Sequence, residues 1–193
     1  MSSRDDILGR VRRNQPAAQP LPEVPPFGSA PTAPLEAFKA ALERMGGKFA
    51  AVADRSEVAA LVRAWFPDAR VVCSATPEVA GNRALEHVRA PGELDDVDVG
   101  VVRAGFGVAE TGSVWLTEAD FKVSALGFLS QHLVVLLDPA AIVTNLHHAY
   151  TRERDFDVGY GVFLTGPSAT ADIEGVLIHG AQGVRSLTVI AVA

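Results

Sequence analysis

The chain has 193 residues, 48% of them hydrophobic, and a formal net charge of −6 at pH 7. This length and composition exclude a disordered chain and suit one domain with a substantial core, while the acidic charge disfavours nucleic acid as a partner. The only cysteine, Cys73, excludes an internal disulfide and a thiolate set for zinc or an iron–sulfur cluster.

The N-terminal segment is polar and lacks the apolar core of a signal peptide, and no apolar run is long enough to span a bilayer. We therefore expect a cytoplasmic protein. Ser3–Arg13 is predicted to form a short helix with Ser3 as its N-cap. Its narrow apolar stripe, which needs another surface to pack on, consists of Ile7, Leu8 and Val11. Residues 15–34 hold most of the prolines and predict an extended arm, either a mobile tail or an arm docked on a second subunit.

After the arm, predicted helices and strands alternate. The predicted helices cover residues 35–45, 55–66, 140–153 and 170–178. The predicted strands cover residues 48–53, 70–74, 97–104, 114–117, 132–138, 160–165 and 187–192. Several strands are almost entirely apolar, which is typical of a parallel sheet. We predict an N-terminal helix and arm over residues 1–34, then an α/β domain over residues 35–193 whose largely parallel sheet is covered by helices on both faces.

The glycine-rich segment at residues 105–112 does not fit dinucleotide binding. Glu110 stands where that motif needs its third glycine, and β-branched and aromatic residues follow instead of a helix. The glycines fit a tight turn between two strands. Glu110 is then either a solvated turn carboxylate or a carboxylate aimed into a cleft at the strand ends. We take Glu110 as a candidate catalytic residue and Thr111 and Gly112 as candidate substrate-binding residues.

The segment at residues 166–175 follows an apolar strand with a Gly-Pro turn, and its hydroxyl and carboxylate residues are predicted to open a helix. The N–H groups at such a helix start can bind an anion or an oxygen-rich ligand. Simple helix capping explains one hydroxyl and one acid, but not the whole cluster. The candidate binding residues here are Ser168, Thr170, Asp172 and Glu174.

The histidines do not predict a metal site. His147 and His148 are adjacent on a predicted helix, so their side chains diverge. His132 begins an apolar strand, where it either bonds to backbone near the sheet edge or contacts substrate. Tyr150 either points its hydroxyl at the cleft or packs in the core. His132, His147 and Tyr150 complete the candidate substrate-binding residues.

Five stretches, in this order, carry a resemblance that spans the C-terminal half of the chain. They are residues 108–112 with 114–115, 128–133, 145–150, 166–168 with 170–174, and 180–181 with 185–189. The ordered set resembles the lactate utilisation protein C family, whose shared unit is the LUD domain. The resemblance implies a fold like that of ribose-phosphate isomerases, glucosamine-phosphate deaminases and CoA transferases. It also implies a role in oxidising L-lactate to pyruvate alongside two iron–sulfur partner proteins.

The chain departs from that family's pattern at positions expected to line the cleft. Ser124 replaces a usual Arg, Gly127 a usual Pro, Ala169 a usual Lys or Arg, and Gln182 a usual His. An anionic ligand loses charge-assisted hydrogen bonds at three of these positions. Either the ligand differs, or this member is a weakened or non-catalytic version.

Three hypotheses follow. The first is an accessory subunit of an iron–sulfur system that oxidises L-lactate, with a small anionic ligand and with the clusters held by the partner proteins. The second is a stand-alone enzyme on a small acyl or sugar-phosphate ligand, since residues 110–112 resemble the nucleophile turn of some CoA transferases. The third is a non-catalytic binding or regulatory module. The exposed N-terminal stripe makes a homo-oligomer a reasonable expectation.

Overall fold

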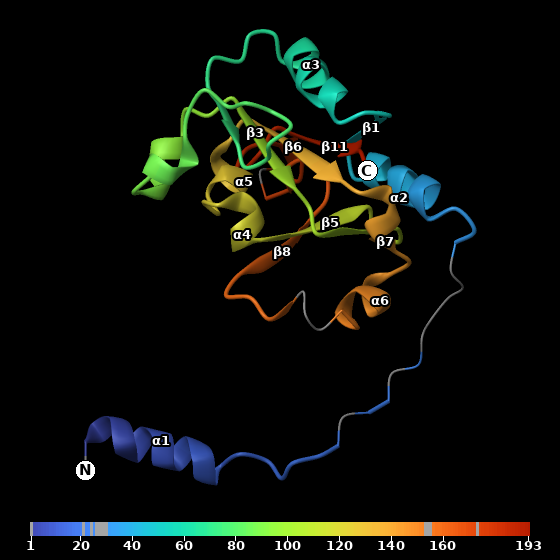
Figure 1. The fold of residues 1–193 in the computed structure, drawn as a ribbon. Helices are drawn as coiled ribbons and strands as arrows, with labels where there is room; N and C mark the ends of the chain where they lie inside the picture. The colour runs from blue at the N-terminus through green and yellow to red at the C-terminus, as the bar shows by residue number, and fades with distance from the viewer. Residues whose placement is uncertain (1, 21, 24, 26–30, 153–155, 173) are drawn as a thin grey trace.

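A central parallel sheet of five strands organises the protein (Figure 1). The structure, a computed structural model, describes residues 2–20, 22–23, 25, 31–152, 156–172 and 174–193. Across the sheet the strands are β1 (Lys48–Ala51), β11 (Ser186–Ala191), β6 (His132–Leu137), β3 (Val99–Arg103) and β2 (Val72–Ser74). All neighbouring pairs are parallel, so the predicted mostly parallel sheet is confirmed.

A second sheet has the order β7-β4-β5-β8, and its strands are β7 (Ile142–Val143), β4 (Phe106–Val108), β5 (Ser113–Thr117) and β8 (Gly161–Leu164). Its β4–β5 and β5–β8 pairs are antiparallel. Strands β9 (Ala169–Thr170) and β10 (Ile178–His179) form a separate antiparallel pair. The sequence predicted β5 and β8 as strands but not their place in a second sheet.

Three longer helices are α1 (Ser3–Arg13), α2 (Pro34–Arg44) and α3 (Ser56–Trp65). Short helices are α4 (Glu118–Phe121), α5 (Leu126–Leu129), α6 (Leu146–Tyr150), and the 3-10 turns η1 (Leu85–His87), η2 (Pro91–Leu94) and η3 (Pro139–Ala141). The predicted range of α1 is confirmed, although Ser2 rather than Ser3 caps it. Gly46, with φ of +80°, follows the end of α2, the position where a left-handed residue stops a helix. None of the described helices could cross a bilayer.

The apolar strands are explained by burial on both faces of the central sheet. Along β6, Leu133, Val135 and Leu137 face one core, whereas Val134 and Leu136 face the other. Val58 and Val62 of α3 close the second core. The first core is closed by α2 and by the second sheet, through residues that include Phe38, Leu42, Val114 and Leu116.

The predicted helix over residues 140–153 is wrong in its first part. Residues 139–141 form η3, and Ile142–Val143 form β7, which pairs with β4. The helix begins only at Leu146, where the Asn145 side chain accepts a hydrogen bond from the His148 N–H at 2.9 Å. Residue 153 lies outside the described residues.

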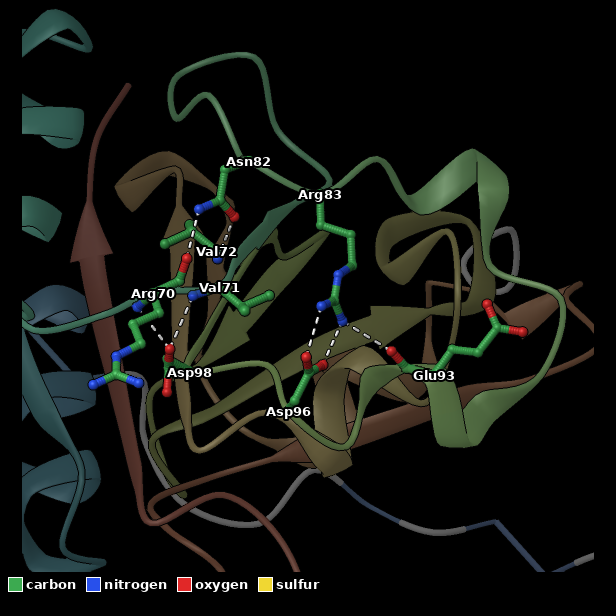
Figure 2. A network of polar contacts seen from close by, with 8 residues as sticks. All are labelled: Arg70, Val71, Val72, Asn82, Arg83, Glu93, Asp96 and Asp98. Atoms are coloured by element: carbon green, nitrogen blue, oxygen red, sulfur yellow. Dashed lines mark hydrogen bonds and ion pairs between the residues drawn. The ribbon is translucent and has the colours of Figure 1, made fainter.

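The outer edge of β2 is closed by a loop that the sequence left unassigned (Figure 2). Asn82 accepts a hydrogen bond from the Val72 N–H at 2.9 Å and donates one to the Arg70 carbonyl at 2.6 Å. The Asp98 carboxylate accepts from the N–H groups of Val71 and Arg70, and these two bonds lower the pKa of Asp98. The Asn82 contacts therefore cover outer-edge groups of β2 that would otherwise be open to pairing with another chain.

Candidate functional site

The turn that carries Glu110, Thr111 and Gly112 joins antiparallel strands β4 and β5, as the glycine pattern predicted. Gly112 has φ of +67°, and a Cβ there would lie 2.2 Å from the backbone nitrogen of Leu42. The α2 backbone therefore packs directly on this turn. The Thr111 hydroxyl accepts a hydrogen bond from the Ser113 N–H at 3.3 Å, which is a local turn interaction.

The exposed Glu110 carboxylate lies against the start of α6. It accepts a hydrogen bond from the Leu146 N–H at 3.1 Å, and the Glu110 N–H donates to the Thr144 carbonyl, also at 3.1 Å. Helix α6 carries the candidate residues His147 and Tyr150, which are both exposed. The structure therefore brings Glu110 beside the helix of these two residues and gives its carboxylate a helix-capping contact.

The predicted helix over residues 170–178 is wrong. Ala169 pairs with His179 and Thr170 with Ile178 in the β9–β10 hairpin. The hairpin tip includes Glu174 with φ of +54° and Gly175 with φ of +71°, a backbone that no right-handed helix adopts. Ile173 lies outside the described residues. The row of N–H donors expected from a helix start is therefore not formed here.

The polar residues of this segment make local contacts instead. The Thr170 hydroxyl lies 3.2 Å from the Asp172 carboxylate and accepts a hydrogen bond from the Asp172 N–H at 3.3 Å. Asp172 and Glu174 are exposed on the hairpin tip. Ser168 is anchored through its backbone, because its N–H donates to the Val184 carbonyl at 2.9 Å and its carbonyl accepts from the Gly180 N–H at 2.7 Å.

Distant segments meet at the amino ends of β6 and β11. His132 Nδ1 lies 2.8 Å from the Ser186 hydroxyl, across 54 residues of chain. The Arg185 N–H donates to the Gln131 carbonyl at 2.8 Å. The preceding residue, Val184, accepts the hydrogen bond from the Ser168 N–H through its carbonyl. We call His132, Ser168, Arg185 and Ser186 the amino-edge cluster.

The two predicted polar turns lie next to each other. The Thr165 hydroxyl, just before the Gly-Pro turn, donates to the Gly112 carbonyl at 3.1 Å. A Cβ on Gly166 would lie 2.1 Å from the Met45 carbonyl, so the end of α2 contacts both turns. Three candidate residues lie where the two turns adjoin: Thr111, Gly112 and Ser168. The Glu110 carboxylate instead contacts α6, and the acids of the second segment lie on the hairpin tip.

His132 is half-buried, and its ring stacks on Phe66 with 4.8 Å between ring centroids. Burial lowers the pKa of His132, and the positive charges of Arg185 and Lys48 lower it further. The imidazole is therefore neutral at neutral pH, with Nδ1 engaged by the Ser186 hydroxyl rather than by the backbone partner that the sequence suggested.

A row of three cavities lies around Phe66, and the sequence did not predict it. The first, about 460 Å³, is lined by residues that include Lys48, Trp65 and Thr188. The second, about 270 Å³, is lined by His132, Asp68 and Asp98 among others, and the third, about 310 Å³, by residues that include Val62, Val72 and Val99. Phe66 lines all three, so we call the row the Phe66 groove. Its sequence signal is the aromatic pair of residues 65 and 66 before Pro67 at a helix end.

Two further observations concern chemistry. Among the described residues, no three His, Cys, Asp or Glu side chains are grouped so that they could hold a metal ion. Cys73 is fully buried in the core, and burial raises the pKa of its thiol. This thiol is therefore core filler rather than a reactive group.

The comparisons with known proteins identify one family whose model matches the chain. The family model of the LUD domain matches residues 90–192. An uncharacterised protein of Neisseria meningitidis serogroup B is 27% identical over 161 residues, which cover 82% of this chain and 66% of that protein. A lactate utilization protein C of Geobacillus is 27% identical over 139 residues, which cover 68% of this chain and 55% of that protein. The matched regions therefore span between half and two thirds of these relatives.

The fold also matches a solved structure, the crystal structure of a DUF162 family protein from Deinococcus radiodurans. The TM-score is 0.63 and the sequence identity 19%, and the match covers 83% of this chain and 96% of the other. At this identity the likeness shows a shared fold alone.

Proposed function

Because the chain belongs to the LUD domain family, we propose that it acts in lactate utilisation, as a cytoplasmic subunit that works with iron–sulfur proteins in oxidising L-lactate to pyruvate. The family match covers every candidate site residue, since these lie between Glu110 and Glu174. The name of the Geobacillus relative supports lactate as the substrate of the pathway.

The proposal that partner proteins are needed rests on the single, buried cysteine. Oxidation of a 2-hydroxy acid to a 2-oxo acid removes two electrons, which need an acceptor. Cys73 is the only cysteine and is fully buried, so this chain offers no thiolate set for an iron–sulfur cluster. Partner proteins would supply the clusters.

The surface near the hairpin offers a place for such a partner. Exposed apolar side chains lie on α5 and at the hairpin tip: Phe128 and Leu129, each 36% exposed, Leu177, 59% exposed, and Val176, 60% exposed. The base of the hairpin lies near α5, because a Cβ on Gly183 would lie 3.0 Å from the Ser168 side chain and 3.9 Å from the Phe128 carbonyl. Apolar side chains gathered beside polar ones mark an interaction surface.

A small anionic ligand is proposed to bind at the amino-edge cluster and its neighbours. The hydroxyls of Ser168 and Ser186 and the neutral imidazole of His132 can hydrogen-bond a carboxylate, and Arg185 adds a positive charge. Glu110 remains the proposed base. The other proposed contacts of the ligand are Thr111, Gly112, His147, Tyr150, Thr170, Asp172 and Glu174.

The test is growth on L-lactate of a deletion strain that carries the gene for this chain or a variant, together with co-purification of cysteine-rich proteins. We expect the unchanged chain to restore growth and to retain iron–sulfur proteins. The double variant Val176→Asp, Leu177→Asp should lose both, whereas Val158→Asp, an exposed apolar residue elsewhere, should keep both. Normal growth of the deletion strain on lactate would refute the proposal.

A further inference from the structure

Helix α1 is formed but has nothing to pack on. It is capped at Ser2 by a reciprocal capping box, yet none of its residues is buried, and it lies apart from the α/β body (Figure 1). Ile7 is 59% and Val11 53% exposed, and Leu8 lies on the same face. A helix of 11 residues is only marginally stable alone in water. Packing of its apolar stripe on another surface would stabilise it.

The Phe66 groove is about as long as such a helix. Its three cavities are lined by residues from all five strands of the central sheet, at or near their amino ends: Lys48, Thr188, His132, Val99 and Val72. Five strands span about 19 Å at about 4.8 Å between neighbours. Helix α1 is about 16 Å long at about 1.5 Å per residue. The helix therefore fits along the groove.

The groove is apolar where the stripe would lie and acidic at its centre. Trp65, which is 37% exposed, and Phe66 line the groove. Aromatic side chains of this kind provide the apolar surface on which an amphipathic helix packs. The central cavity is lined by Asp68 and Asp98 and by no Lys or Arg of the described residues, whereas Lys48 lines the first cavity and Arg63 the third. In α1, Arg10 and Arg12 flank the stripe, whereas Arg13 lies on the opposite face.

We propose that α1 of one copy docks in the Phe66 groove of a second copy, and that the two copies exchange these helices reciprocally. Within one chain α1 lies away from its own body, and a two-fold exchange fills both grooves with identical contacts. The stripe of Ile7, Leu8 and Val11 packs against Trp65 and Phe66, and Arg10 or Arg12 pairs with Asp68. The dimer requires neither lactate nor an iron–sulfur partner, although His132 lines both the groove and the proposed ligand site, so the docked helix would lie beside that site.

The experiment measures the mass of the full chain in solution over a range of concentrations and, in the same samples, the emission of Trp65. The chain has two tryptophans, and Trp115 is 5% exposed, so acrylamide quenching reports mainly on Trp65. We expect a dimer whose Trp65 is shielded from acrylamide. Ile7→Asp with Val11→Asp should weaken dimerisation at least tenfold and expose Trp65.

Charge variants make the test specific. Arg10→Glu with Arg12→Glu should weaken the dimer, while the matched variant Arg13→Glu, on the far face, should not. Asp68→Arg should weaken it too, and combining Asp68→Arg with Arg10→Glu and Arg12→Glu should restore it. A monomer at every concentration overturns the proposal, and stripe-dependent shielding of Trp65 in that monomer would assign the groove to the chain's own α1 instead. A dimer that the stripe variant leaves intact also overturns it.

Discussion

The Glu110 carboxylate accepts a hydrogen bond from the Leu146 N–H at 3.1 Å, across 36 residues of chain. Leu146 is the first residue of α6, and its N–H has no partner within the helix. The residue that the sequence marks as a catalytic candidate therefore also holds the start of the helix that carries His147 and Tyr150.

Replacing Glu110 separates these two roles. Glu110→Ala should cost about 1 kcal/mol of the free energy of unfolding, the usual cost of losing a helix cap. Glu110→Gln keeps an acceptor oxygen and should unfold like the unchanged protein in urea. If Glu110→Gln also restores growth on lactate, Glu110 acts as a cap; if it folds normally but abolishes growth, the carboxylate takes part in the chemistry.

His132 should make stability depend on pH. Burial and the nearby positive charges of Arg185 and Lys48 hold the pKa of His132 below its ordinary value of about 6.5. The unfolded chain then binds the proton more readily, so the stabilisation is fully present above pH about 6.5 and is lost as pH falls through the lowered pKa.

Urea unfolding at pH 7.5 and pH 5.5 measures this effect. The loss of stability on acidification should be smaller in His132→Gln than in the unchanged protein. His87→Gln, at an exposed site, serves as the control and should show the same loss as the unchanged protein. An equal pH dependence in all three proteins would contradict the prediction.

Glycine substitutions test the packing of α2 on the turn between β4 and β5. Gly112→Ala places a Cβ 2.2 Å from the Leu42 nitrogen at φ of +67°, so we expect a loss of at least about 2 kcal/mol. Gly175 has φ of +71° but nothing within 4 Å of a Cβ, and Gly175→Ala should cost about 1 kcal/mol. Gly92→Ala, with open space and an ordinary φ, should be nearly neutral in thermal unfolding. A different ranking would refute this packing.

Two ion pairs should differ sharply in strength. Arg103 Nη2 lies 2.5 Å from Glu78 Oε1, the Glu78 side chain is only 5% exposed, and its Oε2 has no hydrogen-bond partner among the described residues. Arg103→Met leaves this carboxylate buried and unpaired, at a cost of about 3 kcal/mol. Asp96→Asn breaks the exposed pair with Arg83 and should change urea unfolding much less. Equal effects of the two substitutions would show that the Glu78 pair is solvated.

Local sequence patterns predicted those parts of the fold that depend on neighbouring residues. The range of α1 follows from its charged ends and its 3.6-residue stripe, and Gly46 marks the end of α2. The apolar strand β6 indicated burial on both faces. The β9–β10 hairpin was not predicted from the sequence, which indicated a helix there instead. Hydroxyl and acidic residues before an apolar run are compatible with a helix start and with a turn.

The same distinction holds for the candidate site. The amino-acid sequence by itself determined the glycine turn of residues 110–112, the single cysteine and the ordered stretches of the LUD domain, because these depend on residue type and spacing. Only the tertiary structure decided that His132 meets Ser186, that Glu110 meets Leu146, and that five strand ends and α3 enclose the Phe66 groove. Such contacts join residues far apart in the chain, and strand pairing and core packing, rather than local propensity, select them.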